Sequence, residues 1–312
     1  MGCGLLGLEL HPGFPATPYV YVLYTLDKNP ANPASSIPTW GDTCPAVPGA
    51  TTDGCVASAR LSRLSASGNV MVPGSEQVLL GLLDDGSGQA WCQQFPSHSI
   101  GSLAFGSDGA LYVSSGDGAS FNTEDYGQLG GTLPNTTTPL VPRNVCGDPP
   151  GGVGGAMTPP TAQGGALRSQ SLRRPSGPVL LNGAILRLDP ATGGPMAENP
   201  LVAHPDDNAK RIVAYGLRNP FRITTRPGTS EVWIGDVGYN SSEEVDRIVA
   251  PTSAPRNFGW PCYEGAGRQS GYDNRNLDSC ETLYAAGSAV PPHYTYSHVG
   301  SSSIAGLTGY FE

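Results

Sequence analysis

The sequence of 312 residues is poor in charge and contains no long apolar run. Only 14 % of its residues are charged and the net charge is −9, so it lacks the basic face that a nucleic-acid partner requires. No stretch approaches the roughly 18 consecutive apolar residues of a membrane span. The first residues, Met-Gly-Cys-Gly-Leu-Leu-Gly, show no basic segment of a signal peptide. We therefore expect neither nucleic-acid binding nor a membrane span.

Glycine and proline are abundant instead. The chain has 43 Gly and 30 Pro, which is roughly twice the ordinary usage of the two residues together. Both disrupt helix interiors, so the chain cannot be mainly helical. Blocks of Leu, Ile, Val, Tyr and Trp recur throughout, and a disordered chain would lack them. The composition therefore predicts an all-β protein with long loops.

The cysteines indicate an oxidising compartment. They form no CxxC pair and no cluster with histidine, which argues against a zinc site. Cys44 with Cys55 and Cys262 with Cys280 each flank a short loop, Cys92 with Cys146 is the remaining plausible pair, and Cys3 is left over. Because many pairings are possible, this pairing is a hypothesis whose alternative is free buried cysteines. Disulfides would place the protein outside the cytosol, either secreted or periplasmic.

A two-strand phrase occurs three times along the chain. Each copy is an apolar strand, a turn built on His-Pro, Asp-Gly or Pro-Gly, and a strand rich in β-branched and aromatic residues. A more amphipathic segment follows each copy, and alternation is expected to direct its arginines outward. The phrases occupy residues 5–25, 101–117 and 220–236, and the amphipathic segments occupy 59–64, 183–189 and 244–249.

A unit of about four strands repeated along a chain is typical of β-propeller blades. We expect one domain over 1–312, with blades at roughly 1–85, 95–205 and 211–265 and the start of another near 290–312. Segments of about 27–57 and 118–181 are expected to be long loops over one face of the propeller. A closed propeller needs more blades, so an incomplete propeller is predicted. A β-sandwich is the alternative, but its short, regular spacing of turns is missing.

Polar residues stand at the ends of the predicted inner strands. His98 precedes the second phrase and Asp117 ends it, whereas Arg218 and Asn219 precede the third phrase. Loops at such positions meet over the central channel of a propeller. Each residue also has a simpler interpretation: a hydrogen-bonded structural histidine, a turn-forming aspartate, or an arginine in a salt bridge between blades. Spacing alone leaves the reaction type open.

Several longer stretches resemble a known family. Together, and in this order, they are similar to the soluble glucose/sorbosone dehydrogenase family, which consists of six-bladed β-propeller quinoproteins that use pyrroloquinoline quinone (PQQ) and calcium. The stretches begin at Gly4 (GLLGLELHPGF), His98 (HSIGSLAFGSDG), Asn182 (NGAILRLDP), Tyr215 (YGLRNPFR), Gly235 (GDVGYN) and Asn257 (NFGWPCYEG).

The resemblance implies a role for individual residues. His98 falls on the catalytic histidine, a general base, and Asp117 falls on the aspartate that orients it. The other matched positions are Arg218 and Asn219, which would contact PQQ, Gly238 and Tyr239, whose backbone carbonyls would bind Ca²⁺, and Asn122, which lies near a substrate-contacting position. In the family the second carbonyl position is a proline, but either residue supplies a carbonyl oxygen.

The implied function is that of an oxidoreductase. It would oxidise the anomeric or aldehyde carbon of a sugar by hydride transfer to PQQ with Ca²⁺, and would pass electrons to an external acceptor. One alternative is a non-catalytic propeller that binds carbohydrate or a protein. The other is a calcium-dependent hydrolase of the lactonase type, which would use Asp236, Asn240 and either Glu243 or Glu244 as metal ligands.

Overall fold

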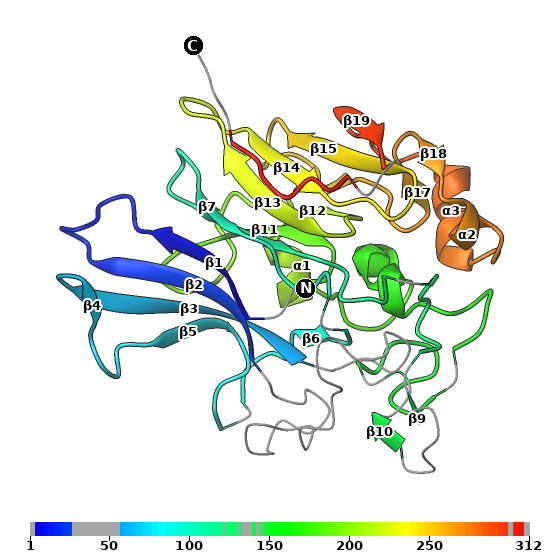
Figure 1. Cartoon of the computed structure of the whole chain (residues 1–312), viewed down its shortest axis with the longest axis horizontal. Helices are drawn as coiled ribbons and strands as arrows, with labels where there is room; N and C mark the ends of the chain where they lie inside the picture. The colour runs from blue at the N-terminus through cyan, green and yellow to red at the C-terminus, as the bar shows by residue number, and fades with distance from the viewer. Residues whose placement is uncertain are drawn as a thin grey trace.

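Three mainly antiparallel sheets form the body of the molecule in the computed structural model (Figure 1). The structure describes residues 4–26, 57–85, 87–95, 97–121, 123–129, 131–132, 139–141, 144, 146–155, 157–298 and 302–308. Cys3, Cys44, Cys55 and Asn122 from the sequence analysis lie outside these residues.

The first sheet contains the N-terminal strands in the order β1-β2-β3-β4, and β5 and β6 also pair with β3. The first phrase of the sequence forms the hairpin β1–β2, as predicted. The strands of the first sheet are β1 (Leu5–Leu10), β2 (Tyr19–Leu26), β3 (Ala57–Ser67), β4 (Val70–Met71), β5 (Gln77–Gly81) and β6 (Cys92–Gln93).

The second and third sheets contain the other two phrases, again as antiparallel hairpins. The second sheet has the order β16-β12-β11-β8-β7, and the third has the order β13-β14-β15-β19. Their strands are β7 (Leu103–Phe105), β8 (Leu111–Ser115), β11 (Ala184–Leu188), β12 (Ile212–Tyr215), β13 (Pro220–Thr225), β14 (Val232–Asp236), β15 (Ser242–Ile248), β16 (Arg256–Asn257) and β19 (Tyr294–Ser297).

Short helices and two small hairpins occupy the connections between strands of the second and third sheets. They are β9 (Gly131–Thr132), β10 (Pro139–Val141), the 3-10 helix η1 (Gly165–Arg173), α1 (Asp207–Arg211), β17 (Tyr263–Glu264), β18 (Gly267–Arg268), α2 (Ser270–Asp273) and α3 (Asp278–Ala286). Within the described ranges, no helix has the length and apolar character needed to cross a membrane.

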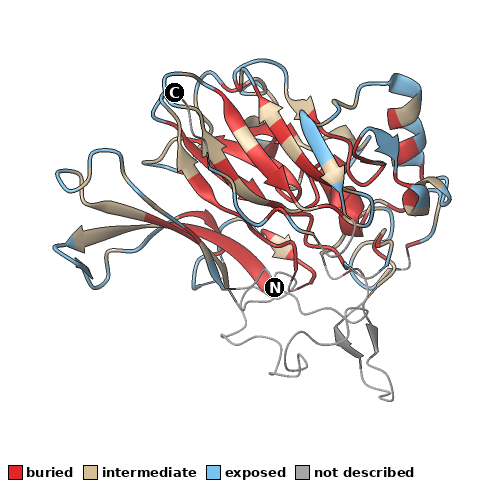
Figure 2. Cartoon of the chain, turned by 45° about the horizontal axis from the view of Figure 1, so that its top comes forward, coloured by how far each residue is buried: buried red, intermediate tan, exposed pale blue. Residues whose placement is uncertain are grey.

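The three sheets pack side by side, like neighbouring blades, with β7 in contact with β1 on one side and β13 on the other. Strand β8 shows how the layers form, because its side chains alternate between two cores. Leu111 and Val113 pack toward the first sheet, whereas Tyr112 packs toward the third. The middle sheet is therefore buried on both faces (Figure 2). Full burial of each such apolar side chain contributes about 1.5–3 kcal/mol.

Two details of the sheets differ from the sequence analysis. The segment near 290–312 contains β19, which pairs with β15 and so forms the fourth strand of the third sheet. The expected outward direction of the arginines is wrong for Arg60 and Arg187, which are both 3 % exposed. Arg187 is paired with Asp108, 79 residues away, at 2.9 Å. A buried charge is tolerated when it has such a partner.

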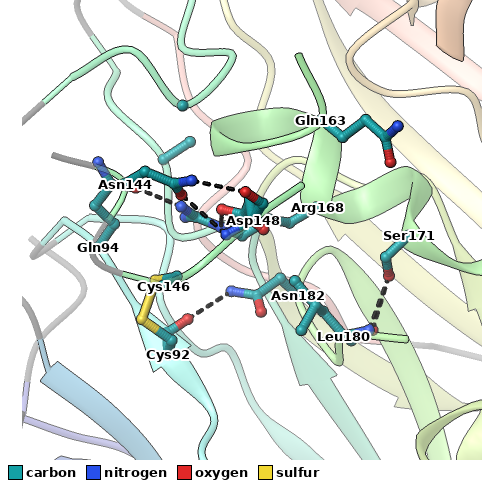
Figure 3. A network of polar contacts seen from close by, with 12 residues as sticks. Cys92, Gln94, Asn144, Cys146, Asp148, Gln163, Arg168, Ser171, Leu180 and Asn182 are labelled. Atoms are coloured by element: carbon teal, nitrogen blue, oxygen red, sulfur yellow. Dashed lines mark hydrogen bonds and ion pairs between the residues drawn. A yellow bond between two sulfur atoms is a disulfide. The ribbon is translucent and has the colours of Figure 1, made fainter. Parts of the chain in front are cut away.

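A disulfide joins the long loop between β8 and β11 to β6 of the first sheet, and a buried ion cluster lies within the same loop (Figure 3). Cys92 is bonded to Cys146, and Cys262 is bonded to Cys280, so both of these predicted pairs are confirmed. Near the first disulfide, the fully buried Asp148 accepts hydrogen bonds from Arg168 at 2.8 Å and from Arg174 at 3.0 Å. These contacts fix the loop that precedes and includes η1.

Candidate active site

His98 is a buried histidine with an unusual backbone conformation. Its φ angle is +51°, and the residue is only 8 % exposed. The left-handed region is uncommon for a residue with a Cβ atom, and histidine is among the residues that enter it more often. Nδ1 lies 3.4 Å from Oδ1 of Asp117, but no hydrogen bond from the described residues satisfies this nitrogen. Strained, unsatisfied groups of this kind concentrate at functional sites.

The protonation state of His98 follows from its surroundings. Burial lowers its pKa most, and the positive charge of Arg218 lowers it further, whereas the Asp117 carboxylate acts in the opposite direction. The resulting pKa is about 4, compared with the ordinary value of 6.5. The imidazole is therefore neutral at neutral pH and is able to accept a proton.

Asp117 is held from three sides. Its Oδ2 accepts a hydrogen bond of 2.8 Å from Nε1 of Trp260, and its Oδ1 accepts one of 2.9 Å from the amide of Ala119. Its own amide donates to the carbonyl of Arg218 at 2.8 Å. The residue is 1 % exposed, so these donors are what stabilises its charge away from water.

Arg218 links the second and third sheets at this point. Its Nη1 donates to the carbonyl oxygens of Val237 at 3.0 Å and Gly238 at 2.5 Å. Its guanidinium also lies over the rings of Tyr239 and Trp260, 5.4 and 5.5 Å from their centres. Cation–π contacts of this type favour a desolvated guanidinium. Trp260 therefore contacts both Asp117 and Arg218.

Asp236 fixes the backbone that carries Arg218 and Asn219. Its two carboxylate oxygens accept hydrogen bonds from the amides of Arg218 at 2.9 Å and Asn219 at 2.6 Å. The carbonyl of Asn219 in turn accepts a bond from the amide of Val237. The turn before β13 and the turn after β14 are thus tied together, although the half-buried Asn219 is connected to the site through its backbone.

An acidic cluster lies beside these turns. Oxygen atoms of the buried residues Asp236, Glu244 and Asp246 lie within 4.8 Å of one another. Burial raises the pKa of Asp236 to about 7 and that of Glu244 to about 8, and raises the pKa of Asp246 well above its ordinary value. The neighbouring carboxylates of the cluster add to the shifts of Glu244 and Asp246. Neither carboxylate oxygen of Asp246 has a hydrogen-bond partner in the part of the chain that the structure describes. The donors are those that a hard cation such as Ca²⁺ prefers.

The structure brings most of the predicted site residues together. His98, Asp117 and Arg218 lie in one connected group, which reaches Gly238 and Tyr239 through the guanidinium of Arg218. The sequence analysis missed the contribution of Trp260, although the residue is part of the Asn-Phe-Gly-Trp-Pro stretch. It also missed Asp246, which a two-residue spacing from Glu244 on one strand would have placed on the same face.

This chain is similar to several solved structures, of which the first two below support the architecture. A protein assigned as an oxidoreductase (glucose dehydrogenase) from Thermus thermophilus matches 95 % of this chain with a TM-score of 0.50 and 22 % identity. A glucose dehydrogenase matches 94 % with a TM-score of 0.52 and 16 % identity. The PQQ-bound aldose sugar dehydrogenase of Streptomyces coelicolor is also similar: it matches 95 % of the chain and 55 % of its own length, with a TM-score of 0.47 and 18 % identity.

The chain spans 57 % and 58 % of the length of the first two structures. With three neighbouring blade-like sheets, it has the fold of a partial β-propeller of the six-bladed type, and the predicted fold class is confirmed. Residues 168–310 match the family model described as Glucose / Sorbosone dehydrogenase. The resemblance that the sequence motifs indicated is therefore confirmed.

Proposed function

We propose that the protein is an oxidoreductase that oxidises the anomeric or aldehyde carbon of a sugar by hydride transfer to PQQ in the presence of Ca²⁺. The observation that carries the proposal is the connected group of a buried, neutral His98, the carboxylate of Asp117 and the guanidinium of Arg218. A base, a group that orients it and a fixed positive charge are what proton removal from a substrate hydroxyl requires.

His98 is the proposed general base. The imidazole removes the proton of the substrate hydroxyl, a role that typically contributes roughly 10²–10⁴-fold in rate. Asp117 faces Nδ1 and stabilises the imidazolium that forms, while Trp260 and Ala119 hold its carboxylate in place. The 3.4 Å separation between imidazole and carboxylate is of the kind that shortens when substrate binds.

The residues around Arg218 fit the proposed cofactors. Arg218 and Asn219 would contact PQQ, and the carbonyls of Gly238 and Tyr239 would hold Ca²⁺. The Gly238 carbonyl already meets a cationic group, Nη1 of Arg218, and the buried carboxyl groups of Asp236, Glu244 and Asp246 add oxygen ligands beside the same turns. When bound, PQQ supplies the hydride acceptor and Ca²⁺ supplies a Lewis acid.

The remaining parts of the proposal concern substrate, partner and location. Asn122 would lie near the sugar, and an external acceptor would take up the electrons. The two disulfides support a secreted or periplasmic location, because such bonds persist in oxidising compartments.

An assay of aldose-dependent dye reduction with PQQ and Ca²⁺ tests the proposal. His98→Asn is the informative variant, because asparagine also tolerates the left-handed backbone at this position. We expect its rate to fall by about 10²–10⁴-fold, while PQQ binding is retained. His204→Asn, the same substitution before α1, is the matched control and should keep the full rate. A rate for His98→Asn within a few-fold of the original would contradict the assignment of the base.

The acidic cluster favours a second candidate, a calcium-dependent lactonase-type hydrolase. Of the ligands that this function would need, Asp236 and Glu244 lie together with Asp246, whereas Asn240 is exposed. Lactone hydrolysis measured with Ca²⁺ and without quinone separates the two functions. Hydrolysis that is lost in Asp246→Asn and retained in His98→Asn would favour the hydrolase.

A further inference from the structure

A single carboxylate oxygen organises the loop that follows Gly238. Oε1 of Glu264 accepts hydrogen bonds from four consecutive amides at 2.8, 2.9, 2.8 and 3.2 Å, and these belong to residues Tyr239, Asn240, Ser241 and Ser242. Glu264 is 5 % exposed, and its other oxygen, Oε2, has no hydrogen-bond partner among the described residues. The loop is thus wrapped around one buried acceptor.

Because the peptide bond is planar, these hydrogen bonds also fix the direction in which two carbonyl groups point. A trans peptide is planar, and its N–H and C=O bonds point to opposite sides. The amide of Tyr239 shares its plane with the carbonyl of Gly238, and the amide of Asn240 shares its plane with the carbonyl of Tyr239. Because both amides point at Glu264, both carbonyls point away from it. The oxygen of Gly238 indeed meets Nη1 of Arg218 on that other side.

The loop is so tight at Gly238 that it has no room for a side chain there. A Cβ atom on Gly238 would lie 1.8 Å from the carbonyl oxygen of Ser242. Glu264 itself comes from β17, the first strand of a hairpin whose turn is fixed by a 2.6 Å hydrogen bond from the amide of Gly265 to Glu244. The disulfide between Cys262 and Cys280 anchors the same hairpin to α3. The acceptor therefore sits on a well-supported element.

We infer that Glu264 is a positioning residue for the cation of this site: it holds the carbonyls of Gly238 and Tyr239 toward a Ca²⁺ ion by binding the amides behind them. The inference rests on the proposed function, which assigns those two carbonyls to calcium. Glu264 acts through the position of its oxygen and contributes no ligand. Residues that orient metal ligands typically change metal affinity by about 10–100-fold when they are replaced.

Two substitutions of Glu264 distinguish the effect of the position of its oxygen from the effect of its charge. Glu264→Gln removes the charge and leaves an oxygen at the same reach, whereas Glu264→Asp keeps the charge and withdraws the oxygen by one methylene. We expect the Gln variant to bind Ca²⁺ within about threefold of the original affinity and the Asp variant to bind it at least about tenfold more weakly. Calorimetric titration with CaCl₂ measures this directly. All proteins carry Asp246→Asn as a common background, which removes one of the three carboxyl groups of the neighbouring acidic cluster.

Each result decides the question. A Gln variant that loses as much affinity as the Asp variant would show that charge matters, and unchanged affinity in both would show that the contacts are dispensable; either would overturn the inference. If the background protein binds no Ca²⁺, the calcium assignment of the proposed function fails as well. Amide hydrogen exchange at residues 239–242, faster in the Asp variant than in the Gln variant, is the accompanying structural readout.

Discussion

The pKa of His98 is the property of the site that can be tested without substrate or cofactor. At a pKa of about 4, roughly one imidazole in a thousand carries a proton at pH 7, whereas about a quarter would do so at the ordinary value of 6.5. The difference of about 2.5 units corresponds to about 3 kcal/mol in favour of the neutral form. Because His98 is almost fully buried, screening by solvent reduces this figure little.

The assay is an NMR titration of the histidine Cε1 resonances in isotope-labelled protein. The chain has five histidines, and the signal that is missing in His98→Asn identifies the one of interest. We expect this signal to move by no more than about a tenth of its full titration shift between pH 8 and pH 5, and kcat/KM to fall by no more than about a tenth from His98 protonation over the same range. A midpoint above pH 6 would refute the electrostatic description of the site.

A variant of Arg218 tests the cause of the shift. Arg218→Met removes the second largest contribution, so the pKa of His98 should rise but remain below 6.5, because burial is the larger cause. Arg222→Met is the matched control, since Arg222 lies on β13 with its guanidinium over Phe221 and is absent from the groups that shift His98. An equal rise in both variants would contradict a specific effect of Arg218.

Two further predictions concern stability. Asp246 is held with a raised pKa, so the folded state keeps a proton that the unfolded chain releases above about pH 4, and the unfolding free energy falls as pH rises from 5 to 8. In EDTA, the free energy of unfolding of Asp246→Asn, relative to that of the original protein, should thus be higher at pH 8 than at pH 5. Urea unfolding measures this difference, and a difference that does not change with pH would contradict the prediction. Trp260→Phe removes the donor to the buried Asp117 carboxylate and should lower the unfolding free energy by about 1.5–3 kcal/mol; a loss below about 0.5 kcal/mol would mean that the bond is not needed.

The strands could be predicted from the sequence because their signals are local. The alternation of Leu111, Tyr112 and Val113 and the Asp-Gly turn before them define a hairpin without reference to the rest of the chain. The buried position of Arg187 could not be predicted in this way, because its partner Asp108 lies on another part of the chain and changes the energetics of burial.

In the candidate site, even more of the contacts join residues that are far apart in the sequence and could not be predicted from local signals. Family motifs identified His98, Asp117 and Arg218, but the hydrogen bond between Asp117 and Trp260 joins residues 143 positions apart. The wrapping of residues 239–242 around Glu264 likewise depends on a hairpin more than 20 residues further along the chain. Such contacts arise from the arrangement of the blades and have no periodicity or spacing that a single sequence displays.

The most direct test of the central idea is whether the group around Arg218 binds the quinone. Titration of the purified protein with PQQ in CaCl₂, followed by the absorbance of the quinone, should show saturable binding that Arg222→Met leaves unchanged and that Arg218→Met weakens by at least about tenfold, the loss of roughly one charge-assisted contact. Absence of saturable binding, or the same affinity in both variants, would contradict the account.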